Sequence, residues 1–213
     1  MPCGGRFRNG QYDQRHAGRQ RQVWERGAMS ILKIARMGHP VLLRRADPVP
    51  DPTAPEIQRL ALDMIETMID APGVGLAAPQ VYQSLRMFVF RVPVSRGGEE
   101  IPPTVLINPE LALLGDEIQM CWEGCLSIPG FRGEVPRAMR VRYRGIGLDG
   151  AVIEREASGF HANVIQHEYD HLNGILYPMR MDDLGRLGFE EEIARAQAAL
   201  AAEQAAERKD DAE

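Results

Sequence analysis

The chain has 213 residues, enough for one domain with a sizeable core and too few for two ordinary catalytic domains. Hydrophobic residues make up 44% and charged residues 26%, as in an ordinary globular protein, and no apolar stretch is long enough to cross a membrane. A formal net charge of −5 argues against sequence-independent nucleic-acid binding, which needs surplus lysine and arginine. The three cysteines, Cys3, Cys121 and Cys125, are too few for a disulfide framework and favour a reducing interior.

The first 28 residues differ in composition from the rest of the chain. They contain six arginines and only two acidic residues, and they show no apolar periodicity before the apolar run that opens at Met29. Three interpretations stay open: a disordered arm, an arginine-rich organellar leader, or translated sequence ahead of a start at Met29. We predict that residues 1–28 form a disordered N-terminal extension.

The first helix is predicted to follow a proline-rich loop. Pro55 suits a first helical position, and apolar residues between Ile57 and Met68 recur at the spacing of one helix face. Pro72 and Gly73 then end the helix. Such an apolar face indicates packing against a hydrophobic core.

Residues 85–157 are predicted to form β-strands. Their apolar runs are short, rich in β-branched residues and bounded by proline or glycine, and one run alternates arginine with apolar residues. Asp149-Gly150 is typical of a hairpin turn. The predicted strands cover residues 87–94, 104–111, 140–144 and 151–153.

A second helix is predicted from Phe160 to Leu172, where Asn173-Gly174 provides a stop. From about Asp182 the sequence becomes rich in alanine and glutamate, which predicts a C-terminal helix.

The second helix carries a His-Glu-x-x-His sequence. His167 and His171 are four residues apart and lie on one helix face, where both imidazoles can bind one metal ion. Glu168 borders that face and can reach a metal-bound water without ligating the metal. A cation lowers the pKa of bound water and a carboxylate can take its proton, so the pattern predicts a metal-dependent hydrolase. The alternative is a helix whose histidines have only structural roles.

A catalytic metal needs a third protein ligand. The acidic residues downstream of the helix are typical of a helix start and a solvated face, so the better candidate is Cys125, within Glu123-Gly124-Cys125-Leu126-Ser127. A thiolate is a strong ligand for Zn(II) or Fe(II). Cys121, four residues earlier, raises the alternative of a closed structural zinc site with both cysteines, but we predict that it is not a ligand.

The chain contains three motifs, Gly73-Val74-Gly75-Leu76-Ala77-Ala78-Pro79-Gln80, Glu123-Gly124-Cys125-Leu126-Ser127 and Gln166-His167-Glu168-Tyr169-Asp170-His171. In this order they resemble the signatures of the peptide deformylase family. The resemblance covers about residues 31–178. It implies an α+β fold in which mixed or antiparallel strands surround a central metal-binding helix. We therefore expect a catalytic domain over residues 29–181, then a C-terminal helix and acidic tail over 182–213.

The resemblance also implies the metal and its ligands. Cys125, His167 and His171 would hold one divalent ion with water in the fourth position. Fe(II) is the usual ion of the family, and Zn(II) or Ni(II) can substitute for it.

The catalytic roles implied by the resemblance agree with the residue types. Glu168 would act as general base and then as proton donor. The side-chain amide of Gln80 and the backbone N–H of Leu126 would hold the oxyanion. Gly75 would offer its backbone to an extended peptide, whose approach a side chain would obstruct.

The remaining substrate contacts are implied in the same way. Arg132 would lie near the peptide backbone of the substrate, and Cys121, Phe160 and Val164 would line the pocket for its methionine side chain. Phe160 and Val164 share the helix face of the two histidines, so ordinary core packing is the alternative for them.

The family removes the N-formyl group from the initiator methionine of nascent chains and releases formate, so N-formylmethionyl peptides are the expected substrates. Some members dock on the ribosome through a basic C-terminal helix, but residues 183–213 contain nine acidic and four basic residues here. Ribosome association stays open, but this acidic helix does not support it, and we expect no direct nucleic-acid binding and no membrane partner. The expected location is the cytoplasm, with an organelle as the alternative.

Two other functions stay open. The same helix could serve another metallohydrolase, such as a peptidase, or a non-catalytic relative that only binds formyl-peptides or metal. Glu168 and Gln80 argue against the second, because a protein without catalysis needs no general base.

Overall fold

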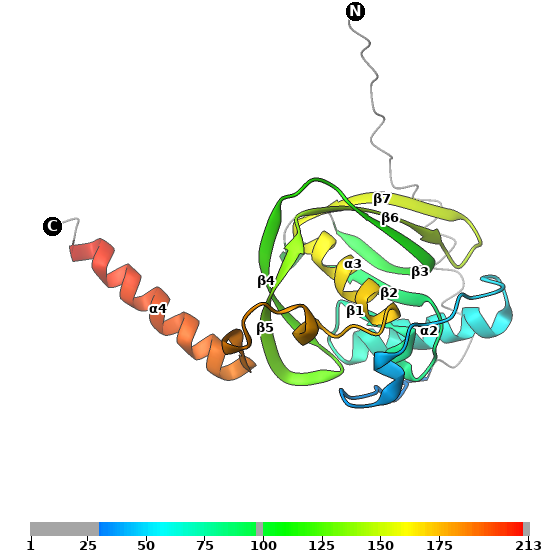
Figure 1. Cartoon of the computed structure of the whole chain (residues 1–213), viewed down its shortest axis with the longest axis horizontal. Coiled ribbons are helices and arrows are strands. Elements are labelled where there is room, and N and C mark those ends of the chain that lie inside the picture. The colour runs from blue at the N-terminus through cyan, green and yellow to red at the C-terminus, as the bar shows by residue number, and fades with distance from the viewer. Residues whose placement is uncertain (1–29, 97–99, 211–213) are drawn as a thin grey trace, which may run out of the picture.

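Three α-helices and two β-sheets form the described part of the chain, which is residues 30–96 and 100–210 of a computed structural model (Figure 1). The α-helices are α2 (Pro55–Asp70), α3 (Gly159–Leu172) and α4 (Glu190–Asp210). The strands are β1 (Gly75–Ala77), β2 (Met87–Val92), β3 (Ile101–Leu113), β4 (Ile118–Cys125), β5 (Ile128–Ala138), β6 (Arg140–Ile146), β7 (Val152–Ser158) and β8 (Leu187–Phe189). Short 3-10 helices are η1 (Pro40–Leu43), η2 (Ala78–Val81), η3 (Val94–Arg96), η4 (Tyr177–Arg180) and η5 (Leu184–Arg186). The predicted extension over residues 1–28 lies outside the described residues.

The strands of both sheets pair only in antiparallel fashion within this part of the chain. The larger sheet has the order β1-β2-β3-β6-β7, and the smaller has the order β4-β5-β8. The predicted α+β class is confirmed. Among these helices, none combines the length and the apolar character that a membrane crossing needs.

Strand β2 shows why the larger sheet is covered on both faces. Its first four residues are apolar, and successive side chains of a strand point to opposite faces. Met87 and Val89 pack in the cluster that contains the apolar face of α2. Phe88 and Phe90 pack in the cluster that contains α3. The two helices therefore lie on opposite faces of this sheet, and both were predicted from their periodicity.

Helix α3 is the central element of the fold. It contacts strands of both sheets, and Figure 1 shows it in the middle of the molecule. Most of its residues are buried, including the polar side chains of its second half. Gln166 shows how such groups are satisfied, because its amide exchanges two hydrogen bonds with the backbone of Ala138 in β5. A helix with polar side chains can therefore be buried on all sides, because its polar groups find hydrogen-bond partners.

The strands of the smaller sheet were not predicted individually. Strands β4 and β5 contain Gly124, Gly133 and Pro136, which interrupt the alternation expected of a strand. Their pairing runs from Ile118 opposite Ala138 to the tight connection at Cys125. This hairpin brings the predicted cysteine ligand toward α3.

The C-terminal helix begins later than predicted. Helix α4 starts at Glu190 rather than at about Asp182, because Leu187–Phe189 pairs with β5 as strand β8. The ring of Phe189 packs on Phe131, with 4.4 Å between the ring centroids. Beyond this anchor α4 projects away from the body of the protein (Figure 1).

Candidate metal centre

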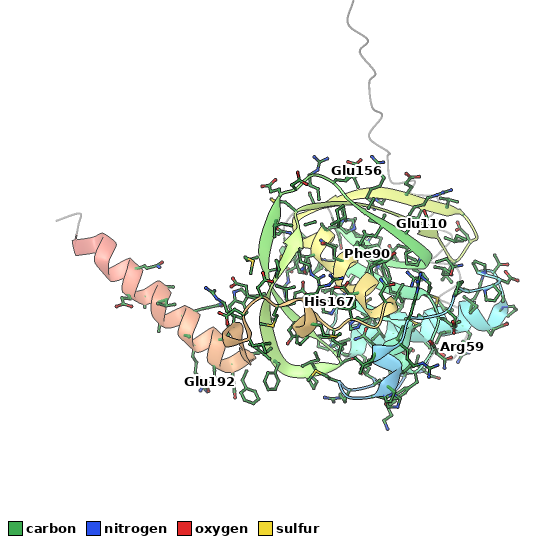
Figure 2. All side chains as sticks on the ribbon, viewed as in Figure 1. Arg59, Phe90, Glu110, Glu156, His167 and Glu192 are labelled. Carbon is green, nitrogen blue, oxygen red and sulfur yellow. The ribbon has the colours of Figure 1, made fainter. Side chains whose placement is uncertain are left out.

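The three predicted metal ligands come together in the structure. One ligand atom from each of Cys125, His167 and His171 lies within 4.8 Å of the other two. The Sγ atom of Cys125 is 3.3 Å from Nε2 of His171. Cys125 is the last residue of β4, whereas both histidines lie on α3 in the interior, where Figure 2 shows His167. Cys121 does not belong to this group, so the alternative of a closed site with both cysteines has no support among the described residues.

The chemistry of this donor set fits a catalytic metal ion. One sulfur and two imidazole nitrogens suit Zn(II) or Fe(II), and three protein ligands leave a coordination position for water or substrate. The Nδ1 atom of His167 is 2.7 Å from a carboxylate oxygen of Glu123, which leaves Nε2 to face a metal. Burial lowers the pKa of His171 well below its ordinary value, and this favours the neutral imidazole that a metal ligand requires.

Glu123 is the centre of a buried network behind His167. Arg137 binds both carboxylate oxygens of Glu123, at 2.7 and 3.0 Å, and Asn163 donates a further hydrogen bond. Burial by itself raises the pKa of Glu123, but hydrogen bonds from His167 and Arg137 and their positive charge lower it to about 2. The carboxylate is therefore ionised, and it fixes the orientation of the His167 ring.

Asp170 extends this network to the surface. It accepts a hydrogen bond of 2.6 Å from Arg137 and is bound through both oxygens by Arg180, on η4. Asp170 is therefore held between two guanidinium groups, one buried and one half-exposed. The role of Asn163 was missed, because nothing in its position along the helix points to Glu123.

Glu168 lies beside the ligands and faces the same space. Its side chain is buried, and its Oε2 atom has no hydrogen-bond partner among the described residues. Burial raises the pKa of Glu168 to about 7. The charge of Glu123 also raises this pKa, whereas the charges of His167 and Arg137 oppose the increase. A carboxyl group with this pKa can accept and release a proton near neutral pH.

Gln80 is held with its amide hydrogens toward the ligands. Its Oε1 atom accepts a hydrogen bond of 2.8 Å from the backbone N–H of Ala77. Its Nε2 atom lies 3.1 Å from Oγ of Ser127 and 3.4 Å from Sγ of Cys125. These contacts therefore hold the amide N–H groups of Gln80 on the side of Ser127 and Cys125.

Two of the three ligands, Cys125 and His167, line a cavity of about 650 Å³. All residues predicted to touch substrate or reacting atoms line this cavity, with the exception of Cys121. Trp122 also lines it, and this residue was not predicted. The predicted residues that line it are Gly75, Gln80, Leu126, Arg132, Phe160, Val164 and Glu168. A place for Cys121 in the methionine pocket stays a prediction.

The absence of a side chain at Gly75 makes room for Glu168. A Cβ atom at this position would overlap the carboxylate of Glu168. The glycine therefore leaves the space in which Glu168 reaches the cavity, which is a constraint that the motif alone did not show.

Comparisons with known proteins agree with this geometry. The family model for polypeptide deformylase matches residues 31–187, which include all three motifs. Peptide deformylase 1 of Nitrosomonas europaea is 50% identical over 162 residues, which are 75% of this chain and 92% of that protein. Peptide deformylase 1 of Xanthomonas campestris is 48% identical over 167 residues, which are 77% of this chain and 98% of that protein.

A solved structure extends the likeness to the fold. The class I type b peptide deformylase from Acinetobacter baumannii, crystallised with Met-Ala-Ser, matches with a TM-score of 0.68 at 38% identity. The match covers 72% of this chain and all of that one. The family model matches most of the described residues, and the relatives are close to 50% identical in sequence. This chain therefore belongs to the polypeptide deformylase family and is an enzyme.

Proposed function

We propose that this enzyme uses one divalent metal ion to hydrolyse the N-formyl group of the initiator formylmethionine of nascent polypeptides, releasing formate. The observation that carries the proposal is the convergence of Cys125, His167 and His171 beside a cavity that is lined by Cys125, His167 and Glu168. Fe(II) is the proposed ion, and Zn(II) or Ni(II) could replace it in the same donor set. We place the reaction in the cytoplasm.

The residues around the cavity have separate tasks in this reaction. A bound divalent ion would polarise the formyl group and lower the pKa of a water molecule. Glu168 accepts a proton from that water as the water oxygen adds to the formyl carbon. It then passes the proton to the amine nitrogen as the C–N bond breaks. The products are formate and a peptide with a free amino group.

Two donors stabilise the negative charge that develops on the formyl oxygen. They are the Nε2–H of Gln80, fixed by its contacts with Ala77 and Ser127, and the backbone N–H of Leu126. Removal of one such donor costs about 3 kcal/mol of transition-state stabilisation in other hydrolases.

The substrate is an extended formylmethionyl peptide. Phe160 and Val164 line the cavity on the face of α3 that carries His167, and we assign them to the methionine pocket. Arg132 lines the same cavity and is assigned to the peptide backbone. The bound Met-Ala-Ser of the Acinetobacter baumannii relative supports a substrate of this kind. We assign residues 29–181 to the catalytic domain.

Formate release from formyl-Met-Ala-Ser tests this proposal directly. We expect the protein, purified anaerobically because its thiolate ligand is open to oxidation, to release formate. A chelator should lower the rate by more than about 100-fold, and Fe(II) should restore it. The acetylated peptide and the unblocked peptide serve as controls. Cleavage of an internal peptide bond without formate release would indicate a peptidase instead, and a rate that is unaffected by metal removal would contradict the proposed chemistry.

Replacing Gly75 by alanine is expected to lower kcat by about 10- to 100-fold, because the new methyl group displaces the carboxylate of Glu168. Metal content should not change, since Gly75 is not a ligand. Gly188→Ala is the matched control, because that glycine lies outside the cavity and a Cβ there meets its nearest atom at an ordinary 3.4 Å. Formate release and metal analysis of both variants would check this, and a Gly75→Ala enzyme with the control's kcat would contradict it.

A further inference from the structure

An ion pair joins the C-terminal helix to the mouth of the cavity. The carboxylate of Glu190, the first residue of α4, lies 2.7 Å from the guanidinium of Arg132 on β5. Both residues line the cavity. A helix that otherwise projects from the body therefore contributes one charged group to the site (Figure 1).

The position of Glu190 is fixed by the strand that precedes it. Gly188 pairs with Arg132 in the register of β8 and β5, and the next pair is Phe189 with Phe131. The rings of that second pair pack against each other at a tilt and anchor the start of α4. Glu190 therefore stands beside Arg132 because of backbone pairing, not because of a chance surface contact.

Arg132 in turn lies next to the reacting centre. It is opposite Gly124, and its Cγ and Nε atoms are the side-chain atoms closest to where a Cβ of Gly124 would stand, at 3.8 and 3.9 Å. Gly124 immediately precedes the ligand Cys125. A peptide that enters the cavity along β4 therefore passes the guanidinium of Arg132.

The other charges around the cavity make Glu190 unusual. Arg36 and Arg96 also line it, and neither forms an ion pair among the described residues, although Arg96 lies over the ring of Phe160. The other carboxylates of the lining, Glu123 and Glu168, are buried. Glu190, whose side chain is 54% exposed, is therefore the one solvent-facing carboxylate in the described lining, among three guanidinium groups.

We propose that Glu190 determines which charges the enzyme accepts in the residues that follow formylmethionine. This inference rests on the proposed function. The carboxylate neutralises the charge of Arg132 and so lowers the positive potential at the mouth of the cavity. Acidic side chains of the substrate are then attracted less strongly there, and basic side chains are repelled less strongly. The same ion pair positions the guanidinium of Arg132 beside the path of the peptide.

The test compares two amidated peptides, formyl-Met-Ala-Asp-Asp and formyl-Met-Ala-Lys-Lys. The readout is the ratio of their kcat/KM values, acidic over basic, because a merely structural role would lower both values together. Glu190→Gln is expected to raise this ratio by about three- to tenfold, mainly through KM, as expected for loss of one partly exposed charge. About 1 M salt should reduce the difference, because the Debye length is then about 3 Å.

Glu191→Gln is the matched control. It removes the same charge from the next residue of α4, which does not line the cavity, and should change the ratio by less than about twofold. Formyl-Met-Ala-Ser amide separates the two proposals. If the unaltered enzyme releases no formate from it, the proposed function is wrong. If the unaltered enzyme does release formate, two results would overturn the assignment of Glu190. One is that Glu190→Gln leaves the ratio unchanged, and the other is that Glu191→Gln shifts the ratio by the same amount.

Discussion

Replacing Glu168 by glutamine is expected to lower kcat for deformylation by about 10²- to 10⁴-fold. The substitution keeps the size of the side chain but removes the group that takes the proton from water. Because Glu168 is not among the three ligands that converge on one point, the variant should bind its metal stoichiometrically. Formate release under saturating peptide, with metal analysis of the same samples, measures both quantities.

The control for this substitution is Glu110→Gln, which changes an exposed carboxylate on β3, away from the cavity (Figure 2). It should retain full activity. If Glu168→Gln matches this control in kcat while holding the same metal, Glu168 is not the general base. The residual activity expected in the variant comes from the oxyanion donors, which the substitution leaves in place.

Replacing Arg137 by methionine is expected to destabilise the protein by about 3–5 kcal/mol. The guanidinium is 4% exposed and binds two buried carboxylates, those of Glu123 and Asp170. Its removal leaves Glu123 with one buried negative charge and fewer partners, and the desolvation cost of that charge is then not offset. Because Glu123 also orients His167, metal affinity should fall by about 10- to 100-fold.

Urea denaturation at a fixed metal concentration would measure the first effect, and competition with a chromogenic chelator would measure the second. Arg142→Met is the matched control, since Arg142 pairs with Glu156 on the exposed face of β6 and β7. That solvent-exposed pair should contribute far less to stability than the buried network around Arg137. Equal losses of stability in the two variants would show that the buried network does not contribute as proposed.

Local patterns in the sequence predicted the elements that depend on local interactions. Helix α2 begins at Pro55 and ends before Pro72, and α3 ends at Leu172, as proline, glycine and apolar periodicity indicated. The spacing of His167 and His171 placed both rings on one face for the same reason. These features follow from the geometry of a single helix, which a short stretch of sequence is enough to specify.

The later start of α4 marks the limit of such reasoning. The composition from Asp182 onward favours a helix, yet Leu187–Phe189 forms β8 because β5 offers an unpaired edge. Pairing with a distant strand outweighed local propensity there. The β4–β5 hairpin was also not resolved from the sequence, because glycine and proline obscure its alternation.

The residues that could bind a metal were predictable from sequence, because ligand chemistry and helix spacing are local properties. The contacts that support them depend on the tertiary fold. Arg137 and Asn163 reach Glu123 from different elements, Glu168 occupies the space that Gly75 leaves open, and Glu190 meets Arg132 across two sheet strands. Each of these contacts joins residues on different elements, and such contacts form only when antiparallel pairing and burial of α3 bring the elements together.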